Sequence, residues 1–146
     1  MATRAAFWLG DPSNLAQREW LGCVAYDGYP NGAVTADLEA VTAPEQLRAW
    51  VAEHLALCSD FAAPSRGWPF PWDDDIYLTD FTYAFFDGQL QVACFYSGFL
   101  LYREVAAKLK EGDWEWPDTE TLPRNVPAPR PYDPTQPDSI MLISSA

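Results

Sequence analysis

The sequence predicts an α+β domain: an antiparallel sheet of four to five strands, two helices packed on one face, and a proline-rich extended C-terminal arm. Three observations support this prediction. Period-two alternation surrounds Asp87-Gly88, apolar residues recur every three or four positions within 42–60, and seven prolines fall between Pro117 and Pro137. We therefore expect one domain over residues 1–116 and an arm over 117–146.

The first predicted elements are two strands and a tight loop. Ala5–Leu9 and Trp20–Tyr26 are rich in apolar and aromatic residues, as strands are. Asp27-Gly28-Tyr29-Pro30-Asn31-Gly32 follows the second strand, and its composition predicts a compact turn. Residues 33–41 are ambiguous and include at most a short helix.

The clearest helix is predicted over Thr42–Asp60. Thr42 and Glu45 match a capping box, and Pro44 falls in the first turn, where a missing N–H does no harm. One apolar stripe contains Leu47, Trp50, Val51, His54, Leu55 and Cys58.

A hairpin and a second helix complete the domain. Ile76–Phe86 and Gln89–Tyr96 are β-rich and flank Asp87-Gly88, a dipeptide typical of type I′ turns. Their alternation predicts a sheet with one covered face. The next helix is expected over Phe99–Glu111, with Ser97 as its cap and Gly112 at its end.

The C-terminal arm lacks the aliphatic content of a domain. It ends in Ser139–Ser144, which is apolar again and is expected to form a short strand. Such a segment docks either on its own sheet edge, the reading we favour, or on a neighbouring subunit. Docking on a neighbouring subunit would produce a homo-oligomer in which subunits exchange their C-terminal arms.

Charge and composition exclude several classes of function. A net charge of −12 argues against direct binding of nucleic acid or of an anionic membrane. No apolar run approaches the roughly 20 residues that span a bilayer, and the start does not match a signal peptide, so a cytoplasmic protein is expected. Cys23, Cys58 and Cys94 are dispersed, and His54 is the single histidine, so neither a metal site nor a cofactor is predicted.

Two clusters combine tryptophans with carboxylates, and both are candidate partner-binding surfaces. Aromatic anchors ringed by carboxylates suit a protein with a basic surface, although the aromatic side chains would equally serve to cover the core. The candidate residues are Trp68, Trp72, Asp73, Asp74, Asp75, Trp114, Glu115 and Trp116.

The turn after the second strand offers an alternative site, for a small ligand or a reaction. Asp27 would act as a base or hydrogen-bond acceptor and Tyr29 as a stacking or phenol group, with His54 or Cys23 nearby. A simpler role for Asp27 is to cap the turn by accepting backbone N–H bonds. No known catalytic or nucleotide-binding motif is found in the sequence.

Three segments together resemble a group of small uncharacterised phage and prophage proteins with an aromatic-DGYP-x-G motif. They are Met1–Arg4, Tyr26–Gly32 and Tyr83–Gly88, and the likeness spans about the first two-thirds of the chain. The sequence departs from the group in residues 10–19 and in the arm. The resemblance implies a phage setting in a host cytoplasm and no particular reaction.

These observations combine into one expectation and one alternative. We expect a phage-type accessory protein that binds a host protein with a basic surface, as an acidic, anti-CRISPR-like inhibitor of a nucleic-acid-binding or defence complex. The alternative is a small-ligand-binding protein or enzyme with its site at the DGYP loop.

Overall fold

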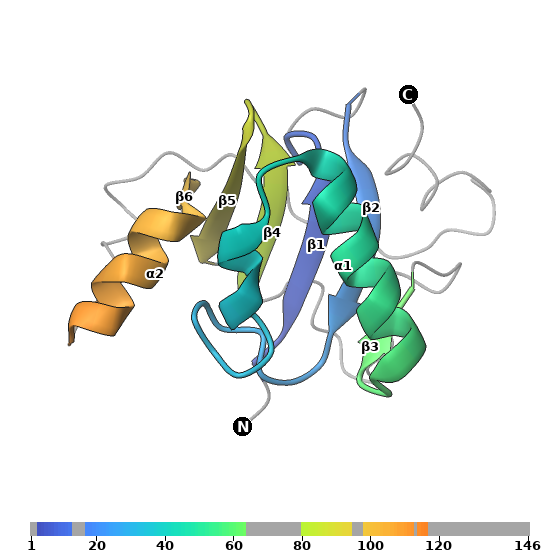
Figure 1. Cartoon of the computed structure of the whole chain (residues 1–146), viewed down its shortest axis with the longest axis horizontal. Coiled ribbons are helices and arrows are strands. Elements are labelled where there is room, and N and C mark those ends of the chain that lie inside the picture. The colour runs from blue at the N-terminus through green and yellow to red at the C-terminus, as the bar shows by residue number, and fades with distance from the viewer. Residues whose placement is uncertain (1–2, 13–16, 64–79, 95–97, 113, 117–146) are drawn as a thin grey trace, which may run out of the picture.

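The computed structural model describes residues 3–12, 17–63, 80–94, 98–112 and 114–116. Within these residues one six-stranded sheet forms, in the order β3-β2-β1-β4-β5-β6 (Figure 1). The strands are β1 (Ala5–Leu9), β2 (Glu19–Val24), β3 (Phe61–Ala62), β4 (Phe81–Phe86), β5 (Gln89–Cys94) and β6 (Leu100–Leu101).

The sheet is mixed, whereas the sequence predicts a purely antiparallel sheet of four to five strands. The central strands β1 and β4 run parallel, with Phe7 opposite Tyr83, and every other neighbouring pair is antiparallel. The two-residue strands β3 and β6 add an edge on each side. The prediction is wrong here because pairing between strands more than 70 residues apart leaves no local signal in either strand.

A β-bulge in β2 places apolar side chains on both faces of the sheet. Phe7 pairs with Gly22 and Trp8 with Trp20, so Leu21 is the extra residue. Leu21 consequently joins the core on one face while Trp20 packs on the other.

Both helices lie on one face of the sheet, as the sequence predicts. The helices α1 (Pro44–Leu57) and α2 (Tyr102–Glu111) and the 3-10 helix η1 (Ala36–Ala40) bury side chains in the larger core cluster (Figure 1). The helical members of this cluster are Leu38, Leu47, Trp50, Val51, Tyr102, Val105 and Ala106.

The opposite face of the sheet also carries a buried apolar cluster. Trp8 and Trp20 stack at 6.2 Å between ring centroids, and the Arg18 guanidinium lies 5.4 Å from the Trp8 ring. The second cluster consists of Ala6, Trp8, Trp20, Cys23 and Ala84. The prediction of a single covered face is therefore wrong, because the bulge and the small residues Ala6 and Ala84 make the second face apolar as well.

Local details of the helices differ from the sequence prediction. The N-cap of α1 is Ala43, and the Gln46 Oε1 accepts bonds from the Thr42 and Ala43 backbone N–H groups, so the expected Thr42–Glu45 capping box does not form. The helix α2 begins at Tyr102 because Leu100–Leu101 pairs with β5 as a strand.

The hairpin between β4 and β5 is confirmed. Asp87 and Gly88 have φ values of 53° and 76°, which the type I′ turn requires. The expected cap Ser97, the segment 64–79 and the arm 117–146 lie outside the described residues. Neither described helix has both the length and the apolar character needed to cross a bilayer.

Candidate functional site

The backbone of the loop between β2 and η1 is held by several hydrogen bonds to buried side chains. We call Asp27–Gly32 the DGYPNG loop; it lies at the end of the sheet where the chain begins (Figure 1). Asp27 and Asn31 adopt positive φ values of 59° and 57°. Asp and Asn tolerate this conformation better than other non-glycine residues, so the turn chemistry predicted from composition is present.

Both glycines of the loop lie close to neighbouring atoms. A Cβ on Gly28 would lie 2.6 Å from the Ala5 Cβ and 3.0 Å from the Thr3 carbonyl oxygen. A Cβ on Gly32 would lie 2.5 Å from the Tyr29 ring. The Tyr29 ring therefore lies over Gly32, and its position depends on the absence of a side chain there.

A buried tyrosine of β4 holds the first half of the loop. The Tyr83 hydroxyl, in a side chain with no exposed surface, donates a 2.6 Å hydrogen bond to the Gly28 carbonyl. The Gly28 N–H donates to the Thr3 carbonyl at 2.9 Å. Burial, and then the neighbouring Tyr102, raise the pKa of Tyr83 well above its usual range, so Tyr83 stays a neutral donor.

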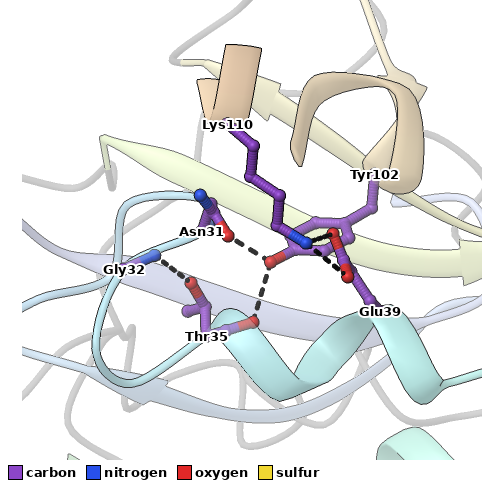
Figure 2. Close-up of polar contacts among 6 residues, drawn as sticks. All are labelled: Asn31, Gly32, Thr35, Glu39, Tyr102 and Lys110. Carbon is purple, nitrogen blue, oxygen red and sulfur yellow. Dashed lines mark hydrogen bonds and ion pairs between the residues drawn. The ribbon is translucent and has the colours of Figure 1, made fainter. Parts of the chain in front are cut away.

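A second buried tyrosine and a buried threonine hold the other half (Figure 2). The Tyr102 hydroxyl donates to the Thr35 carbonyl at 2.7 Å and accepts from the Asn31 N–H at 3.2 Å. The Thr35 hydroxyl donates to the Tyr29 carbonyl at 2.7 Å and accepts from the Gly32 N–H at 3.2 Å. The loop is thereby fixed to β4, to α2 and to the start of η1.

On this fixed backbone the loop region displays aromatic side chains to solvent. Tyr26 is 56% exposed and Tyr29 is 42% exposed, and Asp27 between them is also exposed. Together with Leu57, these two tyrosines are the exposed large hydrophobic residues of the described part of the chain. We call Tyr26, Asp27 and Tyr29 the exposed triplet.

His54, the third residue of the predicted ligand site, lies elsewhere. Its Nδ1 donates to the Trp50 carbonyl at 2.8 Å, and its ring packs 4.0 Å from the Trp50 ring and 4.9 Å from the Phe61 ring. Within the described residues no hydrogen bond, ion pair or ring contact joins His54 to Asp27 or Tyr29. The geometry therefore gives no catalytic group formed by these three side chains.

Trp114, Glu115 and Trp116, which we call the second acidic cluster, pack partly against the core. Trp114 and Trp116 are half-buried, their rings are 5.5 Å apart, and Trp116 meets the Phe81 ring at 5.8 Å. Glu115 between them is exposed. The two tryptophans therefore serve at least as core cover. The remaining partner-binding candidates, Trp68, Trp72, Asp73, Asp74 and Asp75, lie outside the described residues.

The described residues offer no metal-binding group, and the thiols of Cys23 and Cys94 are not activated. No three side chains of His, Cys, Asp or Glu gather there in a way that could hold a metal ion. Burial raises the pKa of Cys23 to about 12, and burial with Asp80 nearby raises the pKa of Cys94 to about 11. Both thiols are therefore protonated at neutral pH, and a thiol is a poor nucleophile.

Sequence reasoning missed the residues that organise this site, namely Thr35, Tyr83 and Tyr102. Tyr83 was predicted only as one residue of an alternating strand, and Tyr102 only as part of a helix. The signal was weak but present, because a buried tyrosine usually finds a hydrogen-bond partner for its hydroxyl.

Comparison of this chain with protein-family models, curated proteins and solved structures finds no match.

Proposed function

We propose that this protein acts by binding another protein through the exposed triplet Tyr26, Asp27 and Tyr29. The observation that carries the proposal is the exposure of Tyr29, on a loop whose backbone is fixed by buried hydroxyl groups, and of Tyr26, directly before that loop. Aromatic side chains on an ordered loop supply contact area at low entropic cost, and tyrosine is enriched among the residues that dominate interface energies.

The partner surface that suits this chain is basic. Asp27, which lies between the two tyrosines in the sequence, offers an exposed carboxylate, and the chain as a whole carries a net charge of −12. Long-range electrostatic attraction between an acidic protein and a basic partner accelerates association and orients the two proteins. An acidic protein docked on a basic surface would also exclude phosphate-bearing ligands, so we extend the proposal to inhibition of a nucleic-acid-binding or defence complex of a phage host.

The second acidic cluster is retained in the proposal as an additional contact. Glu115 is exposed, while Trp114 and Trp116 fix its position by packing on the core. A binding role is favoured over a reaction at the DGYPNG loop because neither group expected beside Asp27 and Tyr29 suits the chemistry. His54 contacts Trp50 and Phe61, and Cys23 is buried in the second cluster, where burial raises its pKa to about 12.

The test is an affinity capture from bacterial lysate with the full chain and two variants. The loop variant combines Tyr26→Ser and Tyr29→Ser. The matched control is Leu57→Ser, which removes a large side chain that is 75% exposed, more than either tyrosine, from the end of α1. We expect one protein or complex to be retained by the wild type and the control, to be reduced at least tenfold with the loop variant, and to be weakened by high salt.

Capture that is identical for all three proteins would overturn the proposal, as would loss with Leu57→Ser alone. If the captured partner binds nucleic acid, a competition titration tests the inhibitory extension. Displacement of the nucleic acid by wild type but not by the loop variant supports inhibition, and simultaneous binding of both ligands rejects it.

A further inference from the structure

A separate cavity lies between η1, the β4–β5 turn and the first turn of α2. Its volume is about 240 Å³, which is below the range of sites for drug-sized ligands and suits a smaller molecule. Its apolar lining comes from Leu38, Val41 and Leu90. Leu38 and Leu90 are buried core residues, so this wall is held in place by the packing of the domain.

The charged groups at the cavity are Glu39 and Arg103, which line it, and Lys110, which pairs with Glu39; together they carry one positive charge. Glu39 lines it, and both of its carboxylate oxygens accept from the Lys110 Nζ, at 2.7 and 2.8 Å (Figure 2). Arg103 also lines it, and within the described residues Arg103 has no hydrogen bond or ion pair. Glu39 is thus neutralised by Lys110, which leaves the Arg103 guanidinium as the uncompensated charge.

We propose that this cavity binds a small organic monocarboxylate with an apolar body. The guanidinium of Arg103 presents a donor fork that matches a carboxylate, and Gln89 adds a polar side chain to the lining. The apolar body of the ligand would rest on Leu38, Val41 and Leu90. One positive charge in a chain of net charge −12 selects a monoanion over a multiply charged anion, which the rest of the molecule repels.

The test uses 3-phenylpropanoate as the probe, followed by chemical shifts of backbone amides in the full-length protein. The controls are 3-phenylpropylamine and 3-phenylpropan-1-ol, which share the apolar body and differ in charge. We expect saturable shifts at Gln89 and Arg103 with a dissociation constant of about 1 mM for the carboxylate, which is a typical affinity for a ligand of this size. The amine and the alcohol should bind at least about tenfold more weakly.

Three variants of two exposed residues on α2 locate the anion. Arg103→Gln should weaken binding of 3-phenylpropanoate about tenfold, whereas Arg103→Lys should retain part of the affinity. Lys108→Gln removes the same charge from the same helix, away from the cavity, and should leave the affinity unchanged.

Three results would overturn the inference: equal binding of the carboxylate and the amine, equal effects of Arg103→Gln and Lys108→Gln, or shifts confined to other parts of the chain. The inference is independent of the proposed protein-binding function. The Tyr26→Ser, Tyr29→Ser variant should bind 3-phenylpropanoate as the wild type does, so failure of one proposal is distinguishable from failure of the other.

Discussion

At the residue scale, the positive φ values of the DGYPNG loop and its close packing contacts occur at different residues. The strained backbone positions are occupied by Asp27 and Asn31, while Gly28 and Gly32 provide space for neighbouring atoms. Gly28 allows the loop to lie against Thr3 and Ala5, and Gly32 allows the Tyr29 ring to fold over the turn. The two glycines therefore differ in what a substitution would displace.

This difference predicts distinct outcomes for two alanine variants. Gly28→Ala should lower the free energy of unfolding by about 1–3 kcal/mol, because the obstructing atoms belong to Ala5 and to the backbone of Thr3 and cannot rotate away. Gly32→Ala should cost less than about 1 kcal/mol, because the Tyr29 ring can swing outward. Urea denaturation measures both changes.

Affinity capture of the partner is a second measurement that tests the Gly32→Ala variant. Since Gly32→Ala displaces Tyr29, it should reduce capture of the partner in the proposed function while the fold is retained. A Gly32→Ala protein that loses as much stability as Gly28→Ala, or that captures the partner normally, would contradict this account of the loop.

At the element scale, α2 is attached to the rest of the domain by two polar interactions in different environments. Tyr102 at its first turn is 1% exposed and bonds to Thr35 and Asn31. Lys110 in its last turn forms an ion pair with Glu39 of η1, and these side chains are 52% and 34% exposed. Water competes for the second interaction but not for the first.

We predict that loss of the buried interaction destabilises the protein more than loss of the exposed ion pair. Tyr102→Phe should cost about 1–3 kcal/mol of unfolding free energy, because the Thr35 carbonyl and the Asn31 N–H lose a partner. Lys110→Met should cost at most about 1 kcal/mol, as exposed ion pairs do. Thermal or urea denaturation checks both, and equal losses would show that burial does not decide the strength of these attachments.

At the scale of the whole molecule, burial on the two faces of the sheet raises the pKa of several acids at once. Cys23 lies in the second cluster, and burial raises its pKa from 9.0 to about 12. Tyr83 and Tyr102 lie in the larger core cluster, and burial raises the pKa of each above its usual value. In all three groups folding favours the neutral, protonated form.

This linkage predicts that the protein loses stability in alkali. The unfolded chain releases the Cys23 proton near pH 9 while the folded chain retains it up to about pH 12, so the stabilisation is complete below pH 9 and is lost as pH rises. Within this window Cys23 should contribute about 1.4 kcal/mol of lost stability per pH unit. Urea denaturation from pH 8 to 11 should show a shallower decline for Cys23→Ala than for the wild type. Parallel curves would rule out this role for Cys23.

Local sequence patterns predicted several elements well, and each case has a local cause. The Asp87-Gly88 turn, the strand Ala5–Leu9 and the body of α1 follow from turn chemistry, β-rich composition and helical spacing within one segment. The DGYPNG loop was likewise predicted as a compact turn from its composition. The capping of α1 by Gln46 was missed because two adjacent residues were equally suited to reach back to the N-terminus of the helix.

The sequence by itself determined the α+β class, the main strands and helices, the acidic charge and the position of the DGYPNG loop, since each depends on residues close together in the chain. The tertiary structure alone decided the parallel pairing of β1 with β4, the burial of both sheet faces and the anchoring of the loop by Tyr83 and Tyr102. The parallel strand pairing and the anchoring of the loop join residues 55 to 76 positions apart. Such contacts arise from packing geometry, which no single segment encodes.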